Sequence, residues 1–582
     1  MFFIIPQNNI RDNAGKNKNY SLKKRNHHKK TPSGFPRFCR CRTGRPETKR
    51  PCLGRPPVRF LPKNLASLHV CVFAKVVLRV YITVKTFEQY WKAHKMIDFT
   101  IHKEVLRKNI REARKHHIIL PTIAQQKDPS LVPPTIREQL GKVGMQEFSP
   151  LNLFRITWKN EPVDFGGTYG KPNILELPHE LTGVPARIFC LLGKWFPTGC
   201  HKVGAAYGCM VPKLVTGQFD VKDQKSVWPS TGNFCRGGAF NAKILSCESI
   251  AVMPENMSRE RFEWLSGIVS ETLRLKGGDS NVKAVFDCVN ELKRNRPDAV
   301  IFNQFEEMGN HLWHYHVTGT AAEEAFEMLR RDGDRFAGVC FATGSAGTIG
   351  CADYLKELHP RMKVAAVESL QCPTMWNNGF GEHRIEGIGD RHVPWIHNIR
   401  NTDDIICIDD ADPMRLLRLF NEPEGHRYLI EEAGVPEDFV AKLGLFGISG
   451  IANVLACIKM AKYYELTERD ILGTVLTDTS VLYRSRVEEL AAAGGPYSVT
   501  RAAMDHAAGM LGIRTDYVRE LTYPERKQIH NLKYYTWVEQ QGHTAEELNR
   551  LWYDPEGTWE SVHRDIGRLD ELIQEFNAAA AE

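Results

Sequence analysis

The stretch FATGSAGTIGCADYLKEL, residues 341–358, decides how the centre of this chain folds. Its apolar start predicts a β-strand, and its amphipathic end predicts a helix. The turn between them contains Gly344, Ser345, Ala346, Gly347 and Thr348. Small residues let several backbone N–H groups face one point at a helix start, so the turn is a candidate phosphate site. A tight turn without a ligand has the same composition, and neither a Walker loop nor a dinucleotide motif is present.

Short apolar runs that predict strands recur on both sides of this stretch. They are residues 186–192, 249–254, 298–303, 336–343, 363–369 and 404–409. Residues 258–275 and 320–331, which lie between such runs, have the pattern of helices. Strands that alternate with helices indicate βαβ units and a parallel sheet covered on both faces. We therefore predict an α/β fold with two parallel-sheet lobes.

The same patterns divide the chain into segments. We expect a helical N-terminal segment at 96–150, an N-terminal α/β lobe at 151–330 and a C-terminal α/β lobe with the candidate phosphate turn at 331–486. Strand signals vanish after about residue 485, so 487–582 should form a helical extension.

Residues 1–95 differ from the rest in charge. They contain 22 of the 77 Lys and Arg residues but only three of the 69 acidic residues, so the remaining chain is acidic. The segment has no hydrophobic period and many Pro and Gly residues, which favours disorder. A nucleic-acid-binding arm and an organelle transit peptide are alternatives, and neither is the preferred interpretation. The preferred interpretation is that translation begins at Met96 and that 1–95 is not native coding sequence.

No membrane-spanning segment is expected. The apolar run at 68–84 is interrupted by Lys75 and Arg79 and is shorter than the roughly 20 residues that cross a bilayer.

The 15 cysteines show no disulfide framework, which favours reduced thiols and a cytoplasmic location. Cys39, Cys41 and Cys52 have poor spacing for zinc. No metal site is predicted.

A second informative stretch is GKWFPTGCHKVGAAYG, residues 193–208. Lys202 stands between a Pro-Thr-Gly turn and a run of small residues that predicts a helix start. A solvated surface lysine needs no such surroundings, whereas an amine in a partly dehydrated pocket is an activated nucleophile.

A third is WPSTGNFCRGGAFNAKIL, residues 228–245, where Ser230, Thr231, Gly232 and Asn233 precede a helix. These residues are typical helix caps, and they equally offer N–H and O–H groups to a carboxylate.

The order of these motifs, followed by GISG at 447–450, resembles the pyridoxal-phosphate enzymes of fold type II, the family of cysteine synthase and the tryptophan synthase β-subunit. The resemblance covers about residues 172–486. It includes VMPENMSRERFEWL, FNQFEEMGNHLWHYHVTGTAAEEAF and, as one stretch after the phosphate turn, HPRMKVAAVES with HRIEGIGD. Together with the four motifs above these make seven matches in the family's order, and such a series is specific. The C-terminal extension has no counterpart in simple cysteine synthases, so the chain resembles a divergent branch.

The resemblance implies pyridoxal 5'-phosphate as cofactor and a role for each motif. Lys202 would form the Schiff base with the cofactor and later move the Cα proton. Asn233 would bond the pyridine 3-oxygen, and Ser449 would face the pyridine nitrogen. Ser230, Thr231, Gly232 and Gln304 would hold the substrate carboxylate. The cofactor phosphate would be bound by Gly344, Ser345, Ala346, Gly347 and Thr348.

A serine at the pyridine nitrogen suits β-elimination and β-replacement on a serine-like amino acid through an aminoacrylate, and makes transamination unexpected. An amino-acid deaminase or ammonia-lyase with the same site stays an alternative, as does a non-catalytic partner-binding subunit. Two departures limit the substrate assignment: Phe234 replaces the threonine usual in cysteine synthases, and His201 precedes the lysine as in tryptophan synthase β. In the phosphate turn, Ala346 replaces the usual glycine, which is a modest change. A homodimer is expected from the family, with a hetero-subunit as an alternative, and the expected partner is an amino-acid substrate and no nucleic acid.

Overall fold

The computed structural model describes residues 96–160, 168–277 and 282–582. In this part of the chain the strands form two sheets of seven and four strands. All six predicted strands are present, as β2, β4, β6, β7, β8 and β9, which confirms the α/β class. The strands are β1 Ile174–Glu176, β2 Arg187–Leu192, β3 Lys225–Pro229, β4 Ser249–Pro254, β5 Glu271–Leu275, β6 Ala299–Ile301, β7 Arg335–Ala342, β8 Lys363–Ser369, β9 Asp404–Ile408, β10 Asp470–Leu476 and β11 Val518–Glu520.

The large sheet has the strand order β1-β2-β10-β7-β8-β9-β11, and the small sheet has the order β5-β4-β3-β6. All pairings in the small sheet are parallel, and only the two edge strands of the large sheet, β1 and β11, pair antiparallel. Because β10 lies between β2 and β7, strands that are far apart in sequence share this sheet. Sequence order alone therefore does not separate the two sheets.

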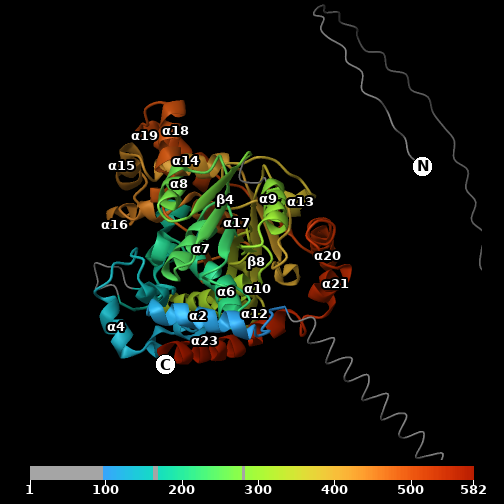
Figure 1. Ribbon diagram of the computed structural model, residues 1–582. Coiled ribbons are helices and arrows are strands. Elements are labelled where there is room, and N and C mark those ends of the chain that lie inside the picture. Colours follow the sequence, from blue (N-terminus) through green and yellow to red (C-terminus); the bar gives the residue numbers. More distant parts are fainter. Residues whose placement is uncertain (1–95, 161–167, 278–281) are drawn as a thin grey trace, which may run out of the picture. The chain divides into compact units, whose positions relative to one another are not determined.

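Helices cover both faces of the large sheet, because alternate residues of each strand point to opposite sides. In β8, Ala365 and Val367 join the core that includes α14 (Ala411–Leu419) and α17 (Ile448–Tyr463). Val364 and Ala366 join the other core, which includes α12 (Ile349–Leu358). Figure 1 labels α17 and α12 together with β8, a strand of the sheet that they cover. A strand buried on both faces explains the continuous apolar runs in the sequence.

The small sheet is built in the same way. Ile250 and Val252 of β4 pack with α9 (Val282–Asn295), while Ala251 and Met253 belong to the main core with α6 (Lys202–Thr216) and α7 (Asn233–Ile244). Of the two helices that begin at predicted site residues, α7 packs on β3 and β4, and α6 packs against α7.

One expected helix was too long. The helix predicted over 258–275 ends at Ser266 as α8 (Arg259–Ser266), and Glu271–Leu275 is strand β5. Gly267 follows the helix directly, and Leu273 and Leu275 then pack on the small sheet's core. Burial against β4 outweighs the helical pattern of these residues.

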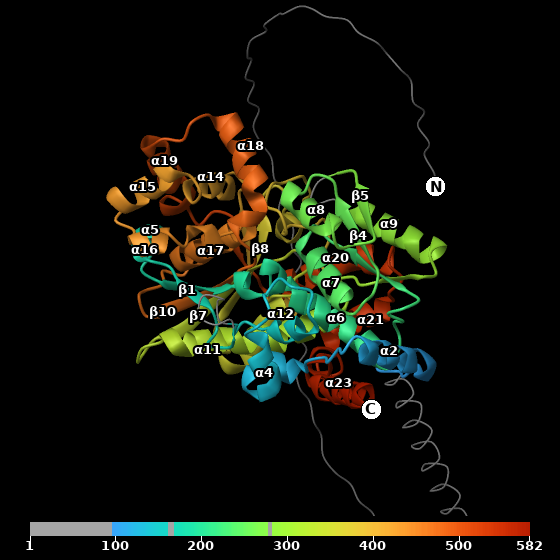
Figure 2. The same ribbon diagram turned by 60° about the vertical axis from the view of Figure 1, so that its left-hand side comes forward.

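The N-terminal helix α2 (Lys103–Lys115) packs against the C-terminal helix α23 (Ile566–Ala581), and both views show the two helices side by side (Figures 1 and 2). Asp570 of α23 also accepts hydrogen bonds from the backbone N–H groups of Ile123 and Ala124 at 2.7 and 3.1 Å. The helical segment expected at 96–150 is thus tied to the end of the chain.

The C-terminal extension is helical as predicted, with one exception. Residues 518–520 form β11, which adds an antiparallel edge strand beside β9, although no strand was expected after about residue 485. A three-residue strand carries too short a pattern to be recognised in sequence.

The remaining helices complete the described part of the chain. They are α3 Ile123–Lys127, α4 Pro134–Leu140, α5 His179–Thr182, α10 Met308–Trp313, α11 Gly319–Leu329, α13 Thr374–Asn377, α15 Pro423–Glu431, α16 Glu437–Val440, α18 Arg484–Gly494, α19 Val499–His506, α20 Tyr523–Lys533, α21 Ala545–Tyr553 and α22 Trp559–Arg564. None of the helices in the described residues has the length and apolar character that crossing a bilayer requires.

Candidate active site

Lys202 is the first residue of α6, and its ammonium has a defined partner. After β2, two short 3-10 turns reverse the chain, with Thr198 and Gly199 at φ values of 71° and 68°. The half-buried side chain of Lys202 then donates from Nζ to Oε1 of Gln304 at 3.0 Å. Lys202, predicted to bind the cofactor, and Gln304, predicted to bind the substrate carboxylate, are therefore in direct contact.

The helix behind Lys202 is packed closely because several of its residues are small. A Cβ on Gly208 would lie 2.4 Å from the backbone oxygen of Gly309 in α10. A Cβ on Gly237 of α7 would lie 2.7 Å from Cα of Val203. These distances are too short for any side chain, so the small residues hold α6 against both neighbours and fix the position of Lys202.

The residues that precede Lys202 are uncharged near neutral pH. Burial and, to a lesser extent, the neighbouring ammonium of Lys202 together lower the pKa of His201 to about 3. Burial also raises the pKa of the Cys200 thiol to about 12. Neither side chain can act as the proton carrier of a reaction at pH 7, which leaves Lys202 as the basic group of this segment.

The turn at residues 230–233 lies where β3 ends and α7 begins. Gly232 has a φ of 138°, which favours glycine, and its N–H donates to Oγ of Ser230 at 3.1 Å. Asn233 starts α7, and its Nδ2 donates to Oδ2 of Asp478 at 2.6 Å. Next to it, the ring of Phe234 is fully buried against Trp228, with ring centroids 5.4 Å apart.

Sequence analysis missed the buried charges that hold this turn. Arg261 of α8 donates to the Thr231 carbonyl at 2.7 Å and lies 3.1 Å from a carboxylate oxygen of Glu386 and 3.6 Å from one of Asp478. The hydroxyl of Tyr483 donates to the same Asp478 oxygen at 2.8 Å. Burial raises the pKa of Asp478, and the arginine opposes this rise. Asp478 follows strand β10, and a carboxylate at the end of a parallel strand was the available signal.

The turn at residues 344–348 follows β7 and leads into α12. Ser345 Oγ accepts from the Gly347 N–H and from Nδ2 of Asn310, each at 3.4 Å, and Ala346 has a φ of 59°. Space is the main constraint here. A Cβ on Gly344 would lie 2.5 Å from the Gly387 carbonyl oxygen, and one on Gly347 would lie 2.3 Å from Asn310 Oδ1.

Asn310 links this turn to the lysine. Its Nδ2 also donates to the backbone oxygen of Gln304 at 2.9 Å, and the side chain of Gln304 accepts from Lys202. Lys202 and the 344–348 turn are thus joined through two intermediate residues, Gln304 and Asn310. Asn310 was not identified from the sequence.

Ser449 is the second residue of α17 and is buried. Gly447, which precedes that helix, donates its N–H to the Asp478 backbone oxygen at 3.1 Å. Asp478 therefore contacts both Asn233 and the start of α17. Among the described residues, Oδ1 of Asp478 and Oδ1 of Asn310 are buried acceptors without a hydrogen-bond partner. Each is free to accept a hydrogen bond from a donor group of a ligand.

Two pockets flank these elements. A pocket of 840 Å³ lies beside Thr198 and Gly199 and is also lined by Arg236, whose guanidinium lies 4.8 Å from the ring centroid of Trp264. This pocket opens next to the turn that precedes Lys202, so it is the candidate route for substrates.

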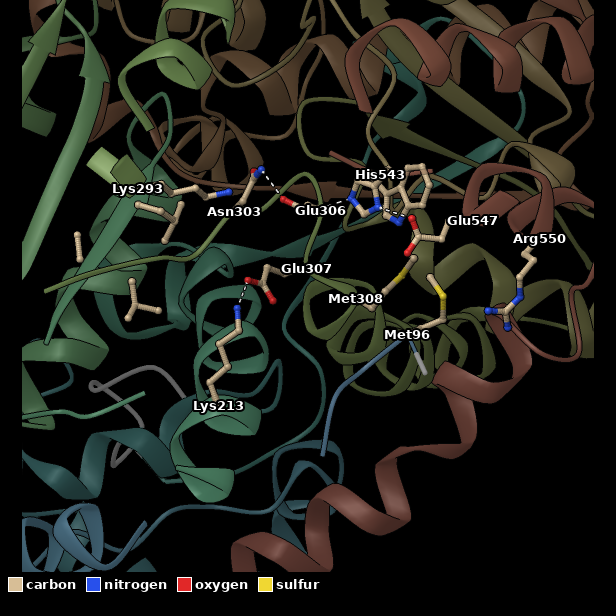
Figure 3. Close-up of a pocket in the computed structure, with 14 residues that line it drawn as sticks. Met96, Lys213, Lys293, Asn303, Glu306, Glu307, Met308, His543, Glu547 and Arg550 are labelled. Atoms are coloured by element: carbon tan, nitrogen blue, oxygen red, sulfur yellow. Dashed lines mark hydrogen bonds and ion pairs between the residues drawn. The ribbon is translucent and has the colours of Figure 1, made fainter. Parts of the chain in front are cut away.

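The pocket of 560 Å³ in Figure 3 lies at the opposite end of α6. Lys213 pairs with Glu307 there, and His543 pairs with Glu306 at 3.0 Å (Figure 3). These half-buried charges pair with one another, and the exposed Lys293 also lines this pocket.

The residues present fit a cofactor that carries a phosphate and an aldehyde. A turn without room for side chains at a helix start presents N–H groups to a phosphate. A lysine with uncharged neighbours supplies the amine. The unpartnered acceptors between the turns supply polar contacts to a ring.

Comparison with known proteins agrees with this fit. A family model described as pyridoxal-phosphate dependent enzyme matches residues 167–434. Cysteine synthase B of Campylobacter jejuni is 30% identical over 267 residues, which are 45% of this chain and 79% of that protein. Cysteine synthase 3 of Caenorhabditis elegans is 28% identical over 316 residues, which are 54% and 86% of the two chains. The solved structure of an O-acetylserine dependent cystathionine β-synthase from Helicobacter pylori has 23% identity and a TM-score of 0.44, over 54% of this chain and 94% of that one.

Proposed function

Because the chain belongs to the family of pyridoxal-phosphate dependent enzymes, we propose that it binds pyridoxal 5'-phosphate through Lys202 and replaces the β-substituent of a serine-like amino acid. The observation that carries the proposal is the hydrogen bond between Lys202 Nζ and Gln304 Oε1, since Gln304 is tied through Asn310 to the 344–348 turn. The names of the relatives, cysteine synthases, support the choice of reaction.

The cofactor's parts have candidate partners in both sheets. The N–H groups of Gly344, Ser345, Ala346, Gly347 and Thr348 would hold its phosphate at the start of α12. Asn233 would donate a hydrogen bond from Nδ2 to the ring's 3-oxygen in place of its hydrogen bond to Asp478. Ser449 would face the ring nitrogen.

Bound pyridoxal phosphate withdraws electrons from the substrate's Cα, which permits loss of the Cα proton and of the β-substituent. Lys202 would accept that proton once the substrate's amino group has displaced its Nζ, and would return it at the end. Its hydrogen bond to Gln304 orients the amine toward the substrate side. His201 and Cys200 stay neutral and do not compete for the proton.

The substrate's carboxylate would be bound by Ser230, Thr231, Gly232 and Gln304. Ser230 and Gly232 already form a compact turn through their hydrogen bond, and Arg261 holds the Thr231 carbonyl. The buried ring of Phe234 packs toward Trp228, so the aromatic replacement changes the core beside the turn. A homodimer and a cytoplasmic location stay predictions.

The test is turnover by the full chain with pyridoxal phosphate, given O-acetylserine or serine with and without sulfide. The proposal predicts cysteine when sulfide is present and little ammonia when it is absent. Lys202→Ala should abolish the product, while Lys243→Ala, an exposed lysine of α7, should leave it unchanged. Ammonia and keto acid released without a thiol would instead identify a lyase. Absence of both cofactor binding and turnover would identify a non-catalytic subunit.

A further inference from the structure

Three potential metal ligands from distant parts of the chain meet beside the candidate site. His311 lies in α10, Asp353 in α12 and His563 in α22 of the C-terminal extension. Nε2 of His311 is 3.0 Å from Nε2 of His563 and 3.6 Å from Oδ2 of Asp353. The three ligand atoms all lie within 4.8 Å of one another, and all three residues are buried.

These separations match the edges of a zinc site. Zinc binds histidine nitrogen and carboxylate oxygen at about 2.0–2.2 Å in a tetrahedron, so two ligand atoms lie roughly 3.3–3.5 Å apart. Two of the three separations, 3.0 and 3.6 Å, fall on either side of this value, and the third is at most 4.8 Å. Shifts of the side chains would bring all three atoms to ordinary bond lengths around one cation.

Neighbouring groups hold the three side chains in place. Asn398 and Asn401 each donate to one carboxylate oxygen of Asp353 at 2.8 Å. The ring of His563 stacks on Tyr315 with centroids 3.6 Å apart. Partners of this kind orient the ligands in known metal sites, since they fix the direction of each lone pair.

The charged neighbours of the cluster are buried with it. Asp353 is its acidic member, although burial raises the pKa of that carboxyl to about 7. Lys533, near His311, donates its N–H groups to the carbonyls of Trp395 and His397, and burial lowers its pKa well below the usual value.

We propose that His311, Asp353 and His563 bind one Zn²⁺ ion, with a water molecule in the fourth position. The ion joins the C-terminal extension to α12, the helix that follows the 344–348 turn. It also fixes α10, where Asn310, the neighbour of His311, links Gln304 to Ser345. The role is structural: the ion secures the extension behind the cofactor turn. No metal was predicted from the sequence, because the three residues are far apart along the chain.

The competing interpretation is a direct hydrogen bond between the two neutral histidines, in which one Nε2–H donates to the other ring. It requires no ion and predicts that chelators have no effect.

The deciding experiment measures metal in the full chain loaded with pyridoxal phosphate and purified without a nickel column. Elemental mass spectrometry should find one zinc per chain, and a chelated sample should take up one equivalent again in calorimetric titration with Zn²⁺. Chelation should also lower the unfolding temperature of the wild-type protein.

Variants then assign the site. His563→Ala and Asp353→Asn should each lose at least nine-tenths of the zinc, because two remaining ligands bind weakly. The matched control is His530→Ala, a buried histidine of the same extension whose Nε2 contacts the Leu548 carbonyl, and it should keep the zinc. Wild-type protein that neither contains nor takes up zinc overturns the proposal even if a variant fails to fold. Equal zinc in the wild type and in His563→Ala overturns the assignment of the ligands.

Discussion

The turns at 230–233 and 344–348 both lead from a parallel strand into a helix at the candidate site, yet they are held in different ways. Buried charges hold the first: Arg261 binds the Thr231 carbonyl, and Asp478 accepts from Asn233. Neutral contacts and lack of space hold the second, through Asn310 and the glycines. Removing one buried charge should therefore loosen the turn at 230–233. The turn at 344–348 should move only when a substitution adds atoms where there is no space.

The largest effect should come from adding a side chain to the second turn. In Gly344→Ala the new Cβ would lie 2.5 Å from the Gly387 carbonyl oxygen, and backbone on both sides resists the shift. We expect at least about a 100-fold loss of affinity for pyridoxal phosphate, since a displaced turn no longer directs its N–H groups to the phosphate. Equilibrium dialysis measures the change. Gly567→Ala, where a Cβ meets nothing within 4 Å, is the control. Wild-type affinity in Gly344→Ala would contradict the steric account of this turn.

Removing one charge from the first turn should cost stability. Asp478→Asn keeps the shape of the side chain but leaves Arg261 with Glu386 as its remaining acidic partner. Breaking a buried ion pair costs about 3 kcal/mol, so the free energy of unfolding in urea should fall by about that amount. Asp287→Asn removes an exposed pair with Lys283 and should change little. Equal stability of Asp478→Asn and the wild type would mean that charges do not hold this turn.

A smaller effect concerns Glu368, in the strand beside β7. Its carboxylate accepts from the N–H groups of Met375 and Trp376 at 3.0 and 2.8 Å, and burial raises its pKa from 4.5 to about 7. The folded state therefore keeps a proton that the unfolded state has lost, so stability falls as the pH rises from about 4.5 to about 7. Glu368→Gln should flatten this slope by up to about 1.4 kcal/mol per pH unit. Urea unfolding at about pH 5 and about pH 7 measures both slopes, and identical slopes would show that Glu368 does not titrate in this range.

Much of the fold could be predicted because parallel strands buried on both faces leave continuous apolar runs. The helix starts at Lys202 and after the turn at 344–348 could be predicted because small residues before a helix are a local pattern. The roles of Lys202 and of this turn stay predictions. The strand-end position of Asp478 left a signal in the sequence, but its contacts did not, and Arg261 and Asn310 left none. Asp478 meets Asn233 only because β10 inserts between β2 and β7, and such pairing depends on strand order. The helix predicted over 258–275 was wrong in its second half for the same reason, because residues 271–275 pair with β4 as strand β5.

The central claim is that Lys202 binds the cofactor covalently. The most direct measurement is reduction of the pyridoxal-phosphate-loaded full chain with borohydride, followed by peptide mass spectrometry to locate the pyridoxyl group. The account predicts modification of Lys202, and its absence from that peptide in Lys202→Ala. Modification of another lysine such as Lys213, or of none, would contradict it.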